Sequence, residues 1–171
     1  MKLVLGAIAS GKSAYAEVVI RDIAGGQPLG YVATMDVSQA DPEMRDKVAK
    51  HQRRRGEDWQ LVQSFGVGVL QEAERLSSTH AVLLDGIGLA VAKEPHLDRW
   101  LGALERFHPS PQHEMVIVSD ETGWGLVPVD AATRHFVTVL GRVNQQLACI
   151  ADQVTVVIAG VALVIKGGKD G

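Results

Sequence analysis

Short apolar runs alternate along this chain with longer segments in which polar and apolar residues are mixed. Each run is only a few residues long and is rich in valine, leucine and isoleucine. A strand that is covered on both faces carries apolar residues at nearly every position, so such runs predict buried strands. The predicted strands are residues 2–5, Leu29–Ala33, Trp59–Gln63, 81–84, 115–118, 154–159 and 162–166.

The mixed segments between these runs predict helices. The predicted helices are residues 13–24, 42–54, 67–76, 97–107 and 131–151. The second of them has the clearest start, with Asp41 as N-cap, Pro42 at the first helical position and Glu43 in the first turn. Gly56 follows its end, where a glycine commonly terminates a helix.

Strands that alternate with helices predict an α/β fold, with a mainly parallel sheet covered by helices on both faces. Right-handed crossovers then bring the carboxyl ends of the strands to one edge of the sheet. The glycine loop after the first strand, the residues after Ala33, Asp85 and the loop 119–128 all fall on that edge. We therefore expect the ligand site there, in a single domain over residues 1–166 with a flexible tail at 167–171.

Composition adds limits to this prediction. The 171 residues are 46% hydrophobic, 22% charged and only 5% aromatic, which predicts one soluble domain with an aliphatic core. The net charge of −3 argues against a general nucleic-acid binder. Cys149 is the only cysteine, and its apolar neighbours predict a buried thiol on a helix. No apolar run is long enough for a membrane span, and we expect a cytoplasmic protein.

The most specific signal is the loop after the first strand, which fits the pattern G-x-x-x-x-G-K-S without a mismatch. Its residues are Gly6, Ala7, Ile8, Ala9, Ser10, Gly11, Lys12 and Ser13. Glycines let consecutive backbone N–H groups point at phosphates, and the following helix adds its positive end. Lys12 is expected to reach the β- and γ-phosphates, and the Ser13 hydroxyl is expected to bind Mg²⁺. The loop predicts a site for a nucleoside triphosphate.

Asp85 closes the apolar strand 81–84, where a P-loop protein places the acid that orients the Mg²⁺ shell. We expect Asp85 to hold Mg²⁺ together with Ser13. The sequence leaves a second interpretation open, because aspartate after an apolar run also caps helices.

The predicted helix 42–54 and the residue after it carry Lys47, His51, Arg54 and Arg55 at spacings of three and four. These residues therefore share one face, which fits a solvated helix surface or a nucleic-acid patch. A third interpretation is a basic wall facing a triphosphate. Nearby cations lower the pKa of an imidazole, and only the neutral ring has a lone pair to attack phosphorus. The helix alone leaves these three interpretations open.

Taken together, the motifs resemble the bifunctional adenosylcobinamide kinase / adenosylcobinamide-phosphate guanylyltransferase family of cobalamin biosynthesis. The matching stretches cover nearly the whole chain. They are 6–13, 31–34, 41–55 with Trp59, 83–85, and the segments from 119–121 to 154–166. The most specific of them is Glu-Thr-Gly-Trp-Gly-Leu-Val-Pro at 121–128, followed by Arg-His-Phe at 134–136 and Gly-Arg-Val-Asn-Gln at 141–145.

The resemblance implies a RecA-like P-loop fold and two reactions. In the first, ATP or GTP phosphorylates adenosylcobinamide. In the second, GTP guanylates a histidine and the GMP passes to adenosylcobinamide phosphate. The histidine of the family lies on the helix after Glu-Met, where this chain has His51 alone. The resemblance also implies nucleotide contacts and a homo-oligomer, often a trimer. The implied contact residues beyond the P-loop are Ala33, Thr34, Met35, Gln52, Arg55 and Asp85.

The chain departs from the family pattern at several positions. Ala9 and Lys47 stand where the family often has arginine, Gln63 replaces a common glutamate, and Asp120 replaces a usual asparagine. The stretch 86–93 lacks the threonine, tryptophan and asparagine that usually follow the acid. These departures cluster where the corrinoid or the guanine is expected to bind.

Two rival functions follow from the same residues. A small-molecule P-loop kinase with a single activity would form no covalent intermediate, and a His51→Ala variant would keep its phosphoryl transfer. A non-catalytic nucleotide-binding module would bind nucleotide and change its assembly without turning over a cobinamide. The loop 121–128 and the predicted helix that carries His51 favour the bifunctional enzyme, because a binding module needs neither.

Overall fold

The computed structural model describes residues 1–35, 46, 49 and 58–168. These residues form a seven-stranded sheet in the order β3-β2-β4-β5-β1-β6-β7. The strands are β1 Lys2–Gly6, β2 Leu29–Ala33, β3 Trp59–Gln63, β4 Ala81–Asp85, β5 Met115–Asp120, β6 Gln153–Ile158 and β7 Val161–Lys166. Every pairing is parallel except the last, in which β7 runs antiparallel to β6.

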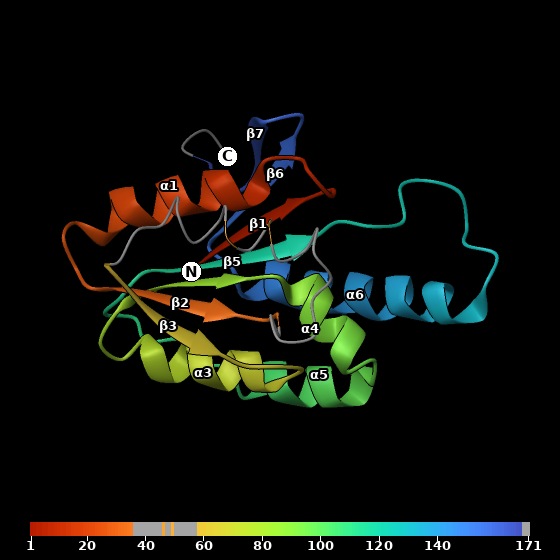
Figure 1. Ribbon diagram of the computed structural model, residues 1–171, viewed down its shortest axis with the longest axis horizontal. Coiled ribbons are helices and arrows are strands. Elements are labelled where there is room, and N and C mark those ends of the chain that lie inside the picture. The colour runs from red at the N-terminus through yellow and green to blue at the C-terminus, as the bar shows by residue number, and fades with distance from the viewer. Residues whose placement is uncertain (36–45, 47–48, 50–57, 169–171) are drawn as a thin grey trace.

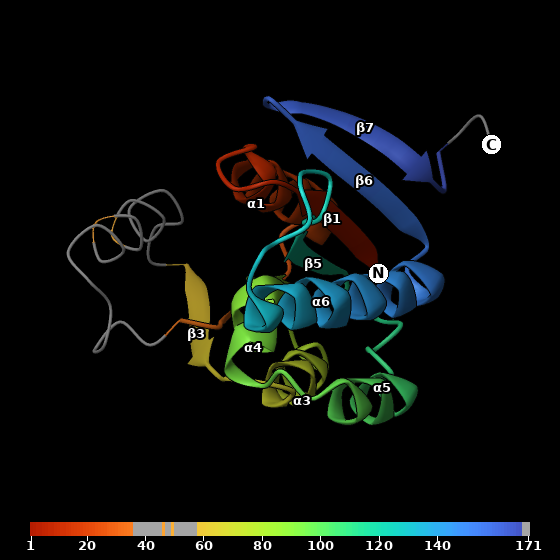
Figure 2. The same ribbon diagram turned by 90° about the vertical axis from the view of Figure 1, so that its right-hand side faces the viewer.

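Helices cover both faces of this sheet (Figures 1 and 2). The helices are α1 Lys12–Ala24, α3 Gly68–Leu76, α4 Ile87–Lys93, α5 Leu97–Glu105 and α6 Ala131–Ile150. Helix α1 lies alone on one face among the described helices, and α3, α4, α5 and α6 lie on the other. The parallel strands all point toward the same edge, the right-hand side of Figure 1, where the loops after β1, β4 and β5 meet.

The alternation of side chains along each strand divides the core into two layers. On β1, Val4 packs with Ile20 of α1, while Leu3 belongs to the layer beneath α3–α6. Leu83 and Leu84 of β4 divide in the same way, and all five of these side chains are essentially fully buried. Apolar residues on both faces are therefore the reason that the strands appear as continuous apolar runs.

The sequence predictions agree closely with this architecture. Strands β2 and β3 have the predicted bounds, and the other described elements differ from prediction by one or two residues at their ends. Helix α4 was not predicted. Its sequence IGLAVAK begins after Gly86 and contains Gly88, and it is too short and too uniformly apolar to show a helical period.

The prediction of a buried Cys149 is wrong, because this thiol is exposed. Leu147 is fully buried on α6. Successive helical residues are about 100° apart, so a residue two positions later faces roughly the opposite side of the helix. The apolar neighbours of Cys149 in the sequence therefore led to a wrong prediction, because they face other sides of the helix.

The predicted helix 42–54 lies outside the described residues, apart from positions 46 and 49, and so do Lys47, His51, Gln52, Arg54 and Arg55. The last three residues of the predicted tail, 169–171, are also outside them. In the part of the chain that the structure describes, no helix is both long and apolar enough to cross a membrane.

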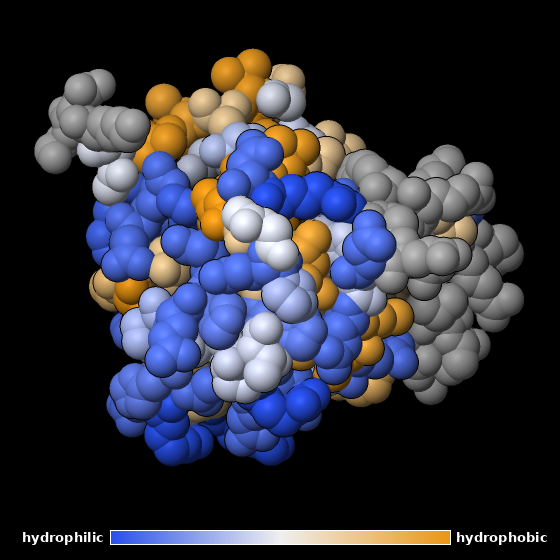
Figure 3. Space-filling view, turned by 90° about the vertical axis from the view of Figure 1, so that its left-hand side faces the viewer, coloured by the Kyte–Doolittle hydropathy of each residue, from blue (hydrophilic) through white to orange (hydrophobic). Residues whose placement is uncertain are grey.

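Strand β7 is the exposed margin of the sheet. Val161, Leu163 and Ile165 are 70%, 60% and 58% exposed, and all six residues of the strand are exposed. Seen from the amino ends of the strands, the surface is largely hydrophilic, and hydrophobic residues gather at the top, over the β6–β7 hairpin (Figure 3). An apolar edge strand of this kind is unusual on a surface in contact with water.

Candidate nucleotide-binding site

The loop between β1 and α1 is shaped by two glycines for different reasons. A Cβ at Gly6 would lie 2.5 Å from Ser10 Oγ and 2.7 Å from the Val157 carbonyl oxygen, so no side chain fits there. Gly11 has a φ of 93°, in the left-handed region that glycine adopts without strain. The backbone N–H of Gly160 donates to the Ser10 carbonyl oxygen at 2.8 Å, which fastens the loop to the β6–β7 turn.

Lys12 is the first residue of α1, and its side chain bends back over the loop. Its Nζ donates to the Ala7 carbonyl oxygen at 3.1 Å and lies 2.7 Å from Asp120 Oδ1. The Lys12 side chain is 13% exposed and that of Asp120 27%. The ammonium group therefore lies in a partly enclosed space between the loop and the end of β5, with one carboxylate as its counter-ion.

Asp85 ends β4 and is surrounded by hydroxyl groups. Ser13 Oγ donates to Asp85 Oδ1 and Tyr31 OH donates to Asp85 Oδ2, both at 3.3 Å. Thr34 Oγ1 donates to the Asp85 backbone carbonyl oxygen, also at 3.3 Å. Serine and aspartate oxygens are the hard ligands that Mg²⁺ prefers, so the neighbouring Ser13 and Asp85 side chains fit the ion expected from the sequence.

The end of β2 supplies the next group of expected nucleotide contacts. Ala33 pairs in register with Asp85, and Thr34 is almost fully buried behind it. The carbonyl oxygen of Met35 accepts a hydrogen bond from Gln63 Nε2 at 2.5 Å. The structure therefore brings the P-loop, the end of β2 and Asp85 to one edge, whereas His51, Gln52 and Arg55 lie outside the described residues.

Asp120 is a site residue that the sequence reasoning did not assign. It follows an apolar strand just as Asp85 does, so the same signal was available. Its partner could not be predicted, because the contact with Lys12 depends on β5 lying directly beside β1, where Gly6 pairs with Asp120.

A buried amide fixes the backbone at Asp120. Asn144 of α6 is 5% exposed, and its Nδ2 donates to the Asp120 carbonyl oxygen at 3.0 Å. The Asn144 Oδ1 accepts from Ser119 Oγ at 2.6 Å. The next residue continues the connection, since the Glu121 N–H donates to the Gly6 carbonyl oxygen at 3.0 Å. The end of β5 and the start of the P-loop are thus tied together.

A hollow of about 350 Å³ opens beside the outer side of the P-loop. Ile8 and Trp124, which line it, are 81% and 73% exposed. Ile158 at the end of β6 completes an apolar wall next to the phosphate loop. The size and lining of this hollow suit a planar or apolar part of a ligand whose phosphates lie on the loop.

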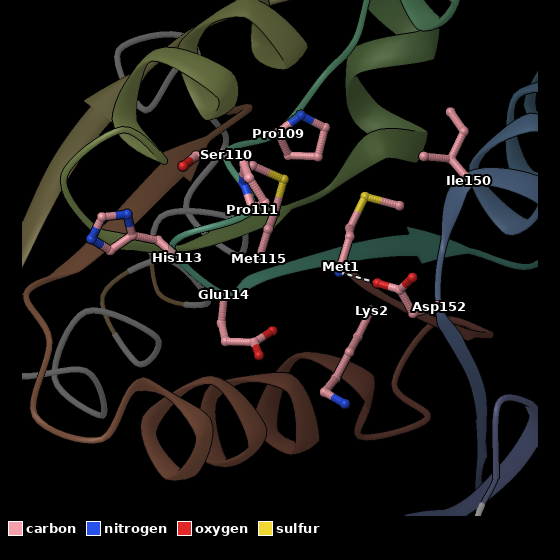
Figure 4. A pocket seen from close by; sticks show the side chains of 10 residues that line it. All are labelled: Met1, Lys2, Pro109, Ser110, Pro111, His113, Glu114, Met115, Ile150 and Asp152. Atoms are coloured by element: carbon pink, nitrogen blue, oxygen red, sulfur yellow. Dashed lines mark hydrogen bonds and ion pairs between the residues drawn. The ribbon is translucent and has the colours of Figure 1, made fainter.

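A second hollow, of about 460 Å³, lies at the other edge of the sheet (Figure 4). It is formed around the starts of β1 and β5, with Met1, Lys2, Met115 and Asp152 among its lining residues. The N-terminal ammonium group lies 2.6 Å from Asp152 Oδ2 there. None of the residues expected to bind nucleotide lines it, so this hollow is not the site predicted from the P-loop.

Solved structures with a similar fold include a flagellar accessory protein and an ATPase. The flagellar accessory protein FlaH from Methanocaldococcus jannaschii superposes with a TM-score of 0.52 at 12% identity, covering 96% of this chain and 77% of that one. An ATPase from a type III secretion system of pathogenic bacteria gives 0.52 at 13% identity, over 91% of this chain and 50% of that one. At such identities the likeness supports the fold alone, an α/β RecA-like P-loop fold.

The curated relatives are closer in sequence. The bifunctional adenosylcobalamin biosynthesis protein CobU of Escherichia coli (strain K12) is 32% identical over 97% of this chain and 99% of its own length. The bifunctional adenosylcobalamin biosynthesis protein CobP of Pseudomonas aeruginosa is 30% identical over 96% of each chain. The family model described as cobinamide kinase / cobinamide phosphate guanyltransferase matches residues 2–165. With its P-loop, Ser13 and Asp85 gathered at one edge of the sheet, this chain belongs to the cobinamide kinase / cobinamide phosphate guanyltransferase family of transferases.

Proposed function

We propose that this protein phosphorylates adenosylcobinamide with ATP or GTP and then transfers GMP from GTP to adenosylcobinamide phosphate. The products of the second reaction are adenosylcobinamide-GDP and pyrophosphate. The observation that carries the proposal is the meeting of Lys12, Ser13 and Asp85 at the carboxyl edge of the sheet, in a chain of this family. The relatives named bifunctional adenosylcobalamin biosynthesis proteins support it.

In the kinase reaction, the P-loop holds the triphosphate with its backbone N–H groups. The aminopropanol hydroxyl of adenosylcobinamide attacks the γ-phosphorus, and the nucleoside diphosphate leaves. Lys12 stabilises the negative charge on the transferring group, since a cation in a partly enclosed site acts more strongly than one in water. Ser13 and Asp85 would hold Mg²⁺, which neutralises charge on the β- and γ-phosphates when it is bound.

In the guanylyltransferase reaction, the neutral imidazole of His51 attacks the α-phosphorus of GTP and pyrophosphate leaves. A phosphate oxygen of adenosylcobinamide phosphate then attacks the phosphorus of the guanylyl group, and the imidazole leaves. One side chain thus serves as nucleophile and then as leaving group, which divides the exchange into two easier steps. The roles of His51, Gln52 and Arg55 rest on the family resemblance.

The proposal extends to nucleotide contacts, assembly and location. Ala33, Thr34 and Met35 would contact the nucleotide from the end of β2, where they lie next to Asp85. A homo-oligomer, a trimer by resemblance, would cover the exposed apolar residues of β7. Both reactions consume nucleoside triphosphates, so we place the enzyme in the cytoplasm.

The covalent intermediate gives the sharpest test. The pure protein is incubated with Mg²⁺ and α-³²P-labelled GTP, denatured, and examined for label on the chain. We expect acid-labile, base-stable label that is lost in His51→Ala and kept in His108→Ala, an exposed histidine after α5. Wild-type protein that binds GTP and never carries label would contradict the guanylyltransferase half and favour a kinase with a single activity.

A further inference from the structure

The ion pair between Lys12 and Asp120 creates a conflict at the phosphate site. Lys12 is the lysine that the P-loop needs for the β- and γ-phosphates, yet its Nζ is 2.7 Å from a carboxylate oxygen of Asp120. A triphosphate and this carboxylate are both anions that seek the same ammonium group. An ammonium group has three N–H donors, and the contacts with Ala7 and Asp120 take two of them, so Lys12 can meet both the β- and the γ-phosphate only if one of these contacts is given up.

The surroundings hold the Asp120 carboxylate at this position. The backbone of Asp120 is tied to α6 through Asn144, as described above. On its other side lies Gly88, where an added Cβ would clash with Asp120 Oδ2 and lie 3.2 Å from its Cγ. Because position 88 is a glycine, α4 leaves room for the carboxylate between itself and Lys12. Helices α4 and α6 therefore both pack against Asp120 while it contacts Lys12.

The two acids at this edge differ in the partners that they have. Asp85 accepts hydrogen bonds from the hydroxyls of Ser13 and Tyr31, which are neutral groups. Asp120 has the ammonium group of Lys12. The described contacts of Asp120 therefore include the ammonium group on which the phosphates are expected to bind.

We propose that Asp120 is a positioning residue that holds Lys12 in the nucleotide-free protein and is displaced from it by the nucleotide phosphates. Asp120 thereby weakens nucleotide binding, and it speeds release of the diphosphate product by recapturing Lys12. This inference rests on the proposed function, since it requires the P-loop to be the nucleotide site.

The test is equilibrium binding of GDP, with and without Mg²⁺, and of GTP in EDTA, by titration calorimetry. Asp120→Asn keeps the shape of the side chain and removes its charge. We expect it to bind each nucleotide up to about fivefold more tightly than wild type, the upper end of the range for a partly exposed ion pair. The dissociation rate of GDP should fall by most of that factor, because affinity changes within one site are mainly changes in dissociation.

Two further variants distinguish competition for Lys12 from a general effect of negative charge and from a loss of folding. Glu121→Gln removes the same charge one residue later, from a side chain with no ion pair to Lys12 among the described residues. It should tighten binding by about twofold or less, because screened charges that are not in contact interact weakly. Asp120→Ala should tighten binding as Asp120→Asn does, and urea unfolding of each variant shows whether its fold is intact.

Three outcomes would overturn the inference. Equal or weaker binding of every nucleotide by a folded Asp120→Asn variant would mean that Asp120 does not compete for Lys12. Weaker binding that appears only with Mg²⁺ would make Asp120 a ligand of the ion instead. If Glu121→Gln tightened nucleotide binding as much as Asp120→Asn, the effect would come from the loss of any nearby negative charge and not from the contact with Lys12. Failure of the wild-type protein to bind GDP and GTP at all would contradict the proposed function itself.

Discussion

Asp85 and Asp120 occupy equivalent places, at the ends of two adjacent parallel strands, and yet they are held in different ways. Asp85 lies among the hydroxyls of Ser13 and Tyr31, whereas Asp120 is paired with Lys12 and packed against Gly88. We propose that Asp85 accepts Mg²⁺ from this position and that Asp120 restrains Lys12. The position of an acid at a strand end therefore does not settle its role, which depends on the groups that face it.

The largest expected effect comes from removing the charge of Asp85. Asp85→Asn should lower kcat for phosphorylation of adenosylcobinamide by about 100-fold, the usual loss when one electrostatic group of a transition-state site is removed. It should also raise the Mg²⁺ concentration needed for half-maximal rate. Steady-state kinetics across a Mg²⁺ titration checks both effects. An Asp85→Asn variant that is as active as wild type at the same Mg²⁺ concentration would contradict the proposed difference in role between Asp85 and Asp120.

A smaller effect is expected from the glycine that makes room for Asp120. Gly88→Ala places a Cβ against the carboxylate and should push it away from Lys12, so that GDP binds a fewfold more tightly. Overpacking costs about 1–3 kcal/mol and the helical preference of alanine returns up to about 1 kcal/mol, so stability should fall by about 1 kcal/mol. Calorimetric titration and urea unfolding measure the two quantities.

Gly141→Ala is the matched control for that substitution. Gly141 also lies inside a helix, α6, but an added Cβ there would meet nothing within 4 Å. This variant should leave nucleotide affinity unchanged and raise the free energy of unfolding by about 0.5–1 kcal/mol. If Gly88→Ala behaved like Gly141→Ala in both measurements, the claim that Asp120 packs closely against α4 would be wrong.

The smallest effect concerns a third acid, Asp130, which caps α6 after the loop that follows Asp120. Its Oδ1 accepts a hydrogen bond from the Thr133 N–H at 2.7 Å, and this bond lowers the pKa of the Asp130 carboxyl. A lowered folded-state pKa stabilises the protein above the ordinary pKa, and this contribution disappears as pH falls through the folded-state value. Asp130→Ala should therefore lower Tm slightly at neutral pH, and by less as the pH falls through the folded-state pKa of this carboxyl.

Thermal unfolding followed by circular dichroism at several pH values checks this last prediction. The difference in Tm between wild type and Asp130→Ala should narrow as the pH falls from about 5 to about 2. A difference that stays constant across this range would mean that the cap does not depend on the charge of Asp130.

Local patterns predicted much of the fold and part of the site. Continuous apolar runs predicted the central strands β1, β4 and β5, because buried parallel strands carry apolar side chains on both faces. The P-loop motif is contiguous in the sequence and Asp85 directly follows an apolar run, so local patterns were enough to propose both as parts of a nucleotide site. The structure then placed Ser13 and Asp85 within hydrogen-bond distance, as expected from the strand ends.

Features that depend on long-range packing could not be predicted from the sequence. The partner of Asp120 depends on which strand lies beside β1, and no local pattern encodes strand order. The apolar run 162–166 predicted a strand but not its place at the open margin of the sheet, where its side chains are exposed. Cys149 shows the same limit at short range, because the direction of one helical side chain was inferred from neighbours on other faces.

The central claim is that both reactions use a nucleoside triphosphate bound on the P-loop, one molecule for each reaction, and a single double-label experiment tests it most directly. GTP labelled at the α- or the γ-phosphorus is incubated with adenosylcobinamide and Mg²⁺, and the label is followed in the corrinoid products. The account predicts γ-label in adenosylcobinamide phosphate and then in adenosylcobinamide-GDP, and α-label in adenosylcobinamide-GDP alone. Both labels should be lost with Lys12→Ala but not with Lys2→Ala. Transfer of both labels by the Lys12→Ala variant at the wild-type rate would contradict it.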